Sequence, residues 1–333
     1  MSSPGNDPLD PQIREFVAAL AAGWARFPDD GARQIAETRR IAEVVRTPWR
    51  LGGPVMASTA EINVATRRGG VRVRIHRPMV DPAPQPTLIY LHGGGWTIFS
   101  LDTHDRIMRE LAARAGVVVC GVDYALSPEA KFPHALEQVV DVARWLHADG
   151  AHAGIDAARI AIGGDSAGAN LAAATSLTLR DAGQAHWLRA MLLAYGCFTN
   201  ELSDQAVRGF GAPGNLLTST EMDGFWDNYL ARQEDALIPY AAPLRAHLHG
   251  LPPAFLIGAQ CDVLCEQSHA FCARLEAAGV EAELHEYAGA THSFLEAVSI
   301  AAVADKAIGD AAAWLRKRLA RDGLNATMID PAA

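Results

Sequence analysis

The chain has little that would place it in a membrane or on nucleic acid. Its 333 residues include no apolar run of the roughly 18 residues that a membrane helix needs. Its 29 lysines and arginines are outnumbered by 38 acidic residues, and the formal net charge is −9. Proteins that bind nucleic acid usually carry a basic patch, because the phosphate backbone attracts one. We therefore expect no membrane span and no nucleic-acid partner.

Cysteine is also sparse, and no secretory leader is visible. Five cysteines are an odd number for a chain of this length and indicate free thiols in a reducing compartment. Residues 1–12 are polar and proline-rich, without a basic segment that leads into an apolar one. The expected location is the cytoplasm.

Metal ligands are not spaced as a metal site requires. Cys261, Cys265 and Cys272 are close in the sequence, but their spacing matches no four-ligand zinc site. His247 and His249 form a His-x-His pair with no third ligand nearby. We therefore expect no metal, and we interpret these side chains as buried thiols and surface histidines.

What the chain does contain is a repeated alternation of continuous apolar runs and amphipathic helical patterns. Such alternation predicts an α/β fold, with a mostly parallel central sheet and helices on both of its faces. The predicted strands are 87–91, 117–124, 159–163, 190–195, 254–258 and 281–287. The predicted helices are 101–114, 135–147, 167–180, 267–278 and 300–319.

Two stretches do not fit this alternation. Residues 1–50 look helical, and residues 200–238 are polar with scattered aromatic side chains. We expect both to form a helical cap over the carboxyl edge of the strands, where ligands bind in open α/β sheets. Peripheral helical decoration is the alternative. The catalytic domain would then comprise residues 51–199 and 239–322, followed by a C-terminal tail at 323–333.

A glycine-rich turn between a strand and a helix carries the strongest chemical signal. The segment Gly164-Asp165-Ser166-Ala167-Gly168 matches G-x-S-x-G and lies between a short apolar strand and an alanine-rich helix. This motif lifts a serine hydroxyl above the sheet on a strained turn, where only small neighbours avoid a clash. Ser166 is thus the candidate nucleophile. The N–H of Ala167, at the start of the helix, would face the reacting carbonyl.

A serine nucleophile needs a base, and the base needs an orienting carboxylate. In the α/β-hydrolase arrangement of these groups the order is Ser, Asp or Glu, His, each after a late strand. Asp262 and His292 follow predicted strands in that order. The other candidates fit less well. His285 lies inside a predicted strand, and His269 and Glu266 lie on a predicted helix. His247 and His249 lie at the wrong edge of the sheet, and Asp123 precedes the serine.

A second glycine cluster, His92-Gly93-Gly94-Gly95, follows the predicted strand 87–91. Bare backbone of this kind could serve a phosphate, a sharp turn or an oxyanion. No Gly-Lys-Ser/Thr follows it, so it is not a P-loop, and Ile98 stands where a dinucleotide-binding turn needs its third glycine. A plain turn would not need three glycines, which favours the oxyanion.

Together these motifs resemble a known family. His92–Gly95, Gly164–Gly168, Asp262-Val263-Leu264 and His292 are similar to the hormone-sensitive-lipase-like branch (family IV) of the α/β-hydrolase superfamily. Two further stretches, 123–138 and 100–112, are similar to segments of that branch, the second to its bacterial acetyl esterases. The resemblance runs from about residue 88 to residue 294.

The chain departs from that family at two positions beside the candidate triad. Val263 stands where the family usually has proline after the acid, which could change the rigidity of that loop. Ser293 precedes Phe294, where the family usually has glycine. Neither change removes a reacting group.

The resemblance implies an α/β-hydrolase fold with a helical cap and a serine carboxylesterase without a cofactor. Its expected partner is a small-molecule ester with a short, acetyl-like acyl group, hydrolysed through an acyl-enzyme intermediate. By analogy with the family, the chain would form a homodimer through its last strand, 281–287.

The resemblance also assigns supporting residues. Gly94, Gly95 and Ala167 would form the oxyanion hole, while His92, Gly93 and Asp165 would support its loop. Candidates for the walls of the substrate pocket, each of which could instead be core packing, are Trp96, Phe99, Tyr195, Phe210 and Trp226.

Other functions remain open at this point. The same triad could serve a lactonase, an amidase or an acyltransferase, because fold-level analogy does not settle the substrate. A different class is a catalytically silent small-molecule receptor with this fold. Such receptors are known to lack the catalytic histidine, which this sequence keeps at position 292, so we favour an enzyme.

Overall fold

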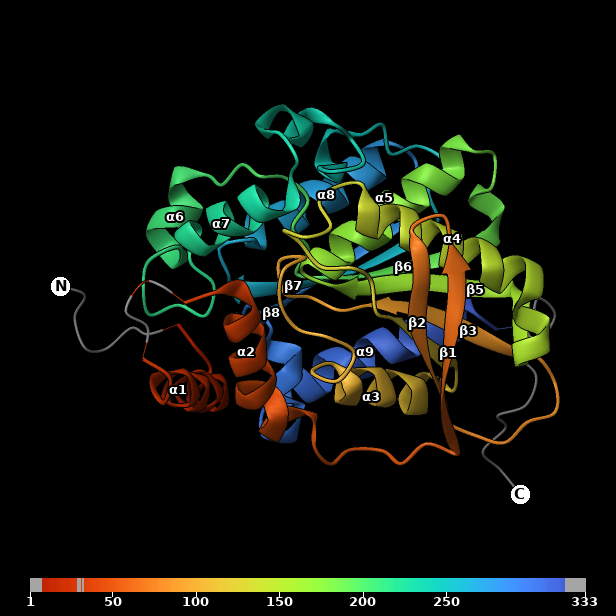
Figure 1. Cartoon of the computed structure of the whole chain (residues 1–333), viewed down its shortest axis with the longest axis horizontal. Coiled ribbons are helices and arrows are strands. Elements are labelled where there is room, and N and C mark those ends of the chain that lie inside the picture. Colours follow the sequence, from red (N-terminus) through yellow and green to blue (C-terminus); the bar gives the residue numbers. More distant parts are fainter. Residues whose placement is uncertain (1–7, 29–30, 32, 321–333) are drawn as a thin grey trace, which may run out of the picture.

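The computed structural model describes residues 8–28, 31 and 33–320, and an eight-stranded sheet runs through its centre (Figure 1). In space the strands follow the order β1-β2-β4-β3-β5-β6-β7-β8. Pairing is antiparallel from β1 through β2 to β4 and parallel from β4 to β8, so the predicted mostly parallel sheet is confirmed.

The bounds of the elements are as follows. The strands are β1 (Ser58–Thr66), β2 (Gly69–Arg77), β3 (Gln85–Leu91), β4 (Val118–Val122), β5 (Ile155–Asp165), β6 (Leu188–Ala194), β7 (Ala254–Cys261) and β8 (Ala282–Thr291). The α-helices are α1 (Pro11–Ala25), α2 (Ile35–Arg50), α3 (Asp105–Ala115), α4 (His134–Asp149), α5 (Ala167–Asp181), α6 (Asp204–Phe210), α7 (Ser219–Tyr229), α8 (Cys265–Ala277) and α9 (Ala302–Arg318). Short 3₁₀ turns are η1 (Gly150–Ala153), η2 (Ala185–Trp187), η3 (Gln233–Leu237), η4 (Pro243–Arg245) and η5 (Phe294–Ser299).

The strands predicted from apolar runs correspond to β3 through β8. The clearest difference is in β8, which runs on to Thr291 rather than ending at Tyr287, so that His292 follows the strand directly. The hairpin of β1 and β2 was not predicted. Its turn pairs Thr66 with Gly69, and β1 is mostly exposed at the edge of the sheet, so no continuous apolar run marks it.

The sheet is buried on both faces, and β3 shows how. Leu88 and Tyr90 pack into one hydrophobic core, while Ile89 and Leu91 pack into the other. This division follows from the two-residue period of a strand, which points successive side chains to opposite faces. Helices α3 and α9 cover one face, and α4, α5 and α8 cover the other (Figure 1).

The two stretches that do not fit the alternation form helices that meet beside the sheet. Figure 1 shows α1, α2, α6 and α7 on the side where the parallel strands end. Ala42 of α2 belongs to a small apolar cluster with Ile98 and Phe99, and Phe225 of α7 packs against it. That these segments form a cap stays a proposal, and the predicted tail 323–333 lies outside the described residues.

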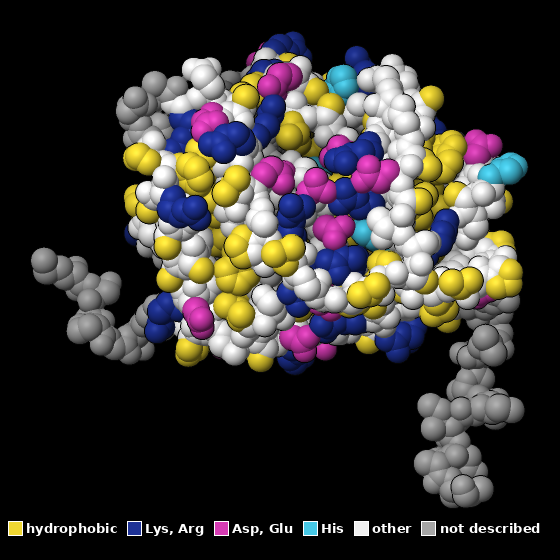
Figure 2. All heavy atoms as spheres, turned by 60° about the horizontal axis from the view of Figure 1, so that its bottom comes forward, with side chains coloured by type: hydrophobic (Ala, Val, Ile, Leu, Met, Phe, Trp, Pro, Cys, Tyr) yellow, Lys and Arg dark blue, Asp and Glu magenta, His cyan; other side chains and the backbone are white. Residues whose placement is uncertain are grey.

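The surface carries both signs of charge close together. Figure 2 shows one face on which basic and acidic side chains are interspersed and neither sign forms a continuous area. Along α3, Arg109 pairs with Asp105 and Arg114 with Glu110. On this face, therefore, basic side chains lie next to acidic ones. Within the described part of the chain, no helix combines the length and hydropathy needed to cross a membrane.

A buried ion pair fixes the second N-terminal helix against the end of the sheet. Arg46 Nη1 of α2 lies 2.8 Å from Glu296 Oε2 of η5, and the two side chains are only 6% and 3% exposed. The contact lacks the angles of a hydrogen bond, so the attraction is mainly Coulombic. The Arg46 guanidinium also lies over the Phe99 ring, 4.7 Å from its centroid.

Breaking this pair should destabilise the fold. We expect Glu296→Gln to lower the free energy of unfolding by about 3 kcal/mol, because it leaves the Arg46 charge buried without a partner. The matched control is Glu37→Gln, which breaks the exposed Arg40–Glu37 pair of the same helix and should leave the midpoint of urea unfolding unchanged. Circular dichroism measures the urea midpoints. Equal midpoints for Glu296→Gln and wild type would contradict this account.

Candidate active site

Ser166 lies on the sharp turn that the sequence predicts between β5 and α5. Its backbone is in a strained region, with φ 54° and ψ −118°. Gly168 explains why the turn needs glycine, because a Cβ there would lie 1.9 Å from the carbonyl oxygen of Leu91. The Ser166 N–H donates to the carbonyl of Ala194 at the end of β6, which anchors the turn to the sheet.

A chain of hydrogen bonds joins the three predicted triad residues. His292 Nε2 lies 2.9 Å from Ser166 Oγ, and His292 Nδ1 lies 2.7 Å from Asp262 Oδ2. All three side chains are buried, with Ser166 7% exposed and Asp262 3% exposed. This is the arrangement in which a histidine takes a proton from a serine while a carboxylate orients the ring.

The acid and the base are positioned by the ends of β7 and β8. The other oxygen of Asp262, Oδ1, accepts the N–H of Leu264 at 3.0 Å, which fixes the carboxylate. Thr291 Oγ1 donates to the carbonyl of Cys261, so the two strand ends are tied together just before His292. Val263, which replaces the family's proline, is buried and leaves this geometry in place.

The glycine cluster after β3 exposes backbone N–H groups beside the turn. In the described part of the chain, the N–H groups of Gly94, Gly95 and Ala167 have no acceptor. Gly94 has a φ of 111°, and a Cβ there would lie 2.2 Å from the Ile98 carbonyl oxygen, so only glycine fits. Unpaired N–H groups at the ends of neighbouring strands can bind an oxyanion.

Asp165 ties the two glycine clusters together. Its Oδ1 accepts the Gly93 N–H at 3.1 Å and the Tyr90 hydroxyl at 2.7 Å. Its Oδ2 lies 3.3 Å from Nε2 of His104, a buried histidine just before α3. The residue next to the candidate nucleophile therefore also holds the first N–H of the glycine segment Gly93–Gly95, the candidate oxyanion loop.

The surroundings shift the pKa values of two buried histidines beside Asp165 in opposite directions. Burial, and then repulsion from His104, lower the pKa of His92 to about 4, so His92 is neutral at pH 7. Burial alone would lower the pKa of His104, but the Asp165 carboxylate outweighs it and raises that pKa above its ordinary value. Burial likewise opposes ionisation of Asp165, yet His104 and the Tyr90 hydroxyl lower the pKa of Asp165. Both shifts favour the charged forms of Asp165 and His104, which lie as a buried pair.

His92 lies against the loop that it was predicted to support. Its Nδ1 is 2.7 Å from the Gly93 carbonyl oxygen, and its ring stacks on Tyr124 at a centroid distance of 4.4 Å. The Tyr124 hydroxyl donates to the His92 carbonyl. In the described residues, no hydrogen bond joins His92 to a triad side chain, and its hydrogen-bond partners are Gly93 and Tyr124.

The five predicted wall residues do not lie together. Trp96 is buried and stacks on Tyr229 at 4.0 Å, with Trp226 packed beside both. Tyr195 contacts the candidate base, with its ring 5.0 Å from that of His292. Phe99 packs against α2 under Arg46, and Phe210 is half-buried against the core that holds α5. Of this set, Tyr195 touches the triad.

An aromatic residue that was not among the predicted wall residues also lies beside the glycine loop. Phe225 of α7 lies against Gly95, since a Cβ on Gly95 would be 2.2 Å from its ring. Its neighbour Trp226, which was named, turns into the aromatic stack with Trp96. No local signal separates the two, because which of them faces the loop depends on how α7 is placed.

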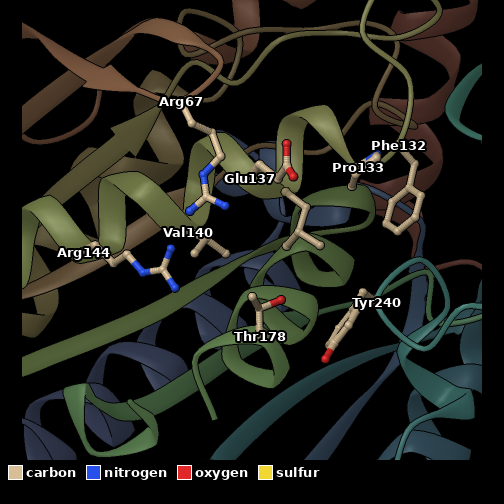
Figure 3. A pocket seen from close by; sticks show the side chains of 9 residues that line it. Arg67, Phe132, Pro133, Glu137, Val140, Arg144, Thr178 and Tyr240 are labelled. Atoms are coloured by element: carbon tan, nitrogen blue, oxygen red, sulfur yellow. The ribbon is translucent and has the colours of Figure 1, made fainter. Parts of the chain in front are cut away.

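A separate pocket lies away from the triad. It has a volume of about 290 Å³ and no triad residue lines it. Figure 3 shows Arg67 and Arg144 on one side of it and Thr178 and Tyr240 on the other. Both guanidinium groups already pair with Asp141. The pocket therefore offers no free cation to an anionic ligand.

Comparison with known proteins decides the family. Residues 88–296 match a family profile described as the alpha/beta hydrolase fold. The chain belongs to the α/β-hydrolase family. The fold class and the family predicted from the two glycine clusters and the ordered triad residues are therefore confirmed.

Solved α/β-hydrolases cover nearly the whole chain. A hyperthermophilic esterase from the archaeon Pyrobaculum calidifontis is 32% identical, with a TM-score of 0.87 over 93% of this chain and 99% of that one. EstE1, a thermostable carboxylesterase cloned from a metagenomic library, is 33% identical, with a TM-score of 0.84 over 87% and 99%. A thermostable esterase from Pseudomonas putida is 29% identical, with a TM-score of 0.85 over 97% and 100%.

These α/β-hydrolases settle the class of the chain. It is an enzyme, a carboxylic ester hydrolase, as predicted. The alternative of a catalytically silent receptor is rejected, because an esterase matches 93% of the chain and its serine, histidine and aspartate are hydrogen-bonded.

The Asp165–His104 ion pair predicts how the stability of this α/β-hydrolase depends on pH. The pKa of His104 is raised in the folded state, so the stability from its charge is fully present below about pH 6.5. It is lost as the pH rises through the raised pKa. The difference in thermal midpoint between wild type and His104→Gln should therefore be largest at low pH and narrow as the pH rises.

Differential scanning calorimetry from pH 5.5 to 9 measures this difference. The exposed His152→Gln is the control and should change the midpoint little at any pH. A gap between wild type and His104→Gln that stays constant or widens with pH would show that His104 acts through packing rather than charge.

Proposed function

We propose that the chain is a serine esterase that hydrolyses short-acyl carboxylic esters through an acyl-enzyme on Ser166. The observation that carries the proposal is the hydrogen-bonded series Ser166–His292–Asp262 beside backbone N–H groups without acceptors. A nucleophile, a base and an electrostatic stabiliser are the parts that acyl transfer requires.

In the first half-reaction, Ser166 Oγ attacks the ester carbonyl carbon while His292 Nε2 takes the hydroxyl proton. Asp262 holds the imidazole in the tautomer that accepts on Nε2 and stabilises the imidazolium that forms. The tetrahedral intermediate then collapses, and the carbon–oxygen bond to the alcohol breaks. The alcohol leaves with the proton that His292 returns, and the acyl group stays on Ser166.

The negative charge that develops on the carbonyl oxygen is received by the N–H groups of Gly94, Gly95 and Ala167. Donors that are already in place need no reorganisation during the reaction, and losing one typically costs about 10²- to 10³-fold in kcat. Asp165 holds Gly93, so it positions this loop without touching the substrate.

In the second half-reaction, water replaces the alcohol. His292 takes a proton from the water, the resulting hydroxide attacks the acyl carbon, and Ser166 leaves with the proton. The products are the carboxylic acid and the regenerated enzyme. An alcohol, an amide or a lactone could enter the same cycle, so acceptor and leaving-group tests distinguish a transferase, an amidase and a lactonase from an esterase.

Bulk beside the oxyanion loop supports a short acyl group. Phe225 of α7 lies against Gly95, and Tyr195 lies against His292, so one aromatic ring borders the glycine loop and another borders the base. We infer that residues 1–50 and 200–238 act as a cap that limits the acyl chain. The proposed cytoplasmic location and the homodimer through the last strand remain predictions; β8 is the strand at one edge of the sheet, and an edge strand can pair with another chain.

The nucleophile is tested by Ser166→Ala. We expect kcat for p-nitrophenyl acetate to fall by about 10⁶-fold, the scale on which serine hydrolases lose activity when the nucleophile is removed. The control is Ser176→Ala, a buried serine on the helix that follows Ser166; it donates to the Ala172 carbonyl, and its loss should leave kcat unchanged. Activity of Ser166→Ala within tenfold of wild type would refute the proposal. Anilide substrates and added alcohols, run in parallel, separate the alternatives.

The acyl preference is tested at Phe225. Wild type should hydrolyse acetyl and butanoyl esters faster than octanoyl esters, and Phe225→Leu should raise kcat/KM for octanoyl by about tenfold relative to acetyl, since a few methylenes in an apolar site account for that much. Phe132→Leu, at a ring that packs against Tyr229 and lines the separate pocket, is the control and should leave the ratio unchanged. Rates that already rise from acetyl to octanoyl in wild type would contradict a short-acyl site.

A further inference from the structure

Three metal-binding side chains meet on the surface where α8 packs on β8. Cys265 and His269 lie one helical turn apart on α8, and Glu286 reaches them from β8. Glu286 Oε2 is 2.6 Å from His269 Nε2 and 3.4 Å from Cys265 Sγ. The ligand atoms of all three lie within 4.8 Å of one another.

We propose that Cys265, His269 and Glu286 bind a zinc ion, with water as the fourth ligand. A thiolate sulfur, an imidazole nitrogen and a carboxylate oxygen suit zinc, whereas magnesium and calcium prefer oxygen alone. Residues four apart on a helix lie on one face, which lets Cys265 and His269 share an ion. Three protein ligands with an open fourth position are a common zinc arrangement.

The distances allow such a site after small side-chain movements. Zinc bonds of about 2.0–2.3 Å in a tetrahedron place ligand atoms roughly 3.4–3.7 Å apart. The Cys265–Glu286 separation of 3.4 Å already fits, and the His269–Glu286 separation of 2.6 Å must open by about 0.8 Å. The His269 side chain is 52% exposed, so it is free to move. Binding releases the thiol proton to solvent, and the ion replaces the two hydrogen bonds.

The site adjoins the acid loop of the triad but does not include it. The Cys265 N–H donates to the Asp262 carbonyl, so the first turn of α8 continues directly from the acid. Glu286 lies on the strand that ends just before His292. An ion bound here would join the helix that follows the acid to the strand that precedes the base. We therefore expect zinc to stabilise this part of the fold.

The sequence predicts no metal here because the third ligand is distant along the chain. Cys265 and His269 are close in the sequence, but Glu286 lies on the next strand, and only the packing of α8 on β8 brings it to them. Cys261 and Cys272, which made the cysteine spacing look unlike a zinc site, are both buried and take no part.

Cobalt absorption tests the site on the full chain after treatment with a chelator. Added Co²⁺ should give a thiolate-to-cobalt charge-transfer band in the near ultraviolet, at one ion per chain, and Zn²⁺ should displace it. Cys265→Ser should abolish the band, and His269→Ala or Glu286→Gln should weaken cobalt binding by about 10- to 100-fold or more. Cys272→Ser, on the same helix, is the control and should keep the band.

Thermal stability is a second readout, and it does not rely on the thiolate absorption band. Zn²⁺ should raise the thermal midpoint of wild type and of Cys272→Ser by more than that of Glu286→Gln, and Mg²⁺ should have no effect. A cobalt band that persists in Cys265→Ser, the lack of any band in wild type, or an equal zinc effect in Glu286→Gln would overturn the proposal. Esterase activity of each variant, measured without metal, confirms that it is folded.

Discussion

The site depends on one carboxylate that joins two strand ends. Asp165 ends β5 beside Ser166, and its oxygens hold Gly93 after β3, the hydroxyl of Tyr90 and the imidazole of His104. Since β3 and β5 are neighbours in the parallel sheet, the glycine clusters that follow them lie at the same edge. The carboxylate turns this adjacency into a fixed relation between a nucleophile and the N–H groups that would receive the charge it creates. Such pre-organisation is a large part of catalysis by acyl-transfer enzymes.

Burying that carboxylate has a cost that the surrounding residues offset. An isolated charge in the interior would be protonated instead, because desolvation disfavours the charged form. Here His104 supplies the opposite charge, while His92 stays neutral next to it. A second buried pair, between α2 and η5, ties the N-terminal helices to the segment that follows His292. Two charge pairs therefore support the site. Asp165–His104 holds the oxyanion loop, and Arg46–Glu296 holds the segment that follows the base.

How far the sequence predicts this molecule depends on where each signal resides. Ser166 and the glycines can be predicted from short segments, because a strained turn and a close backbone approach accept few residue types. Asp262 and His292 can be predicted because each comes directly after a late strand, in the order that the triad requires. The β1–β2 hairpin was not predicted because its exposed edge has no apolar run. Phe225 and the Cys265–His269–Glu286 cluster are products of packing between elements, which no short segment encodes. The sequence therefore predicts the reacting groups from short motifs, but it does not predict the shape of the pocket.

The central claim is that the acyl group of the substrate passes through Ser166. Its most direct test is to mix the enzyme with p-nitrophenyl acetate, quench with acid within milliseconds and map the peptides by mass spectrometry. The account predicts one acetyl group, on the peptide that contains Ser166 and at that side chain, and none in Ser166→Ala. Hydrolysis without acetylation of Ser166, or a transient acetyl group on another residue, would contradict it.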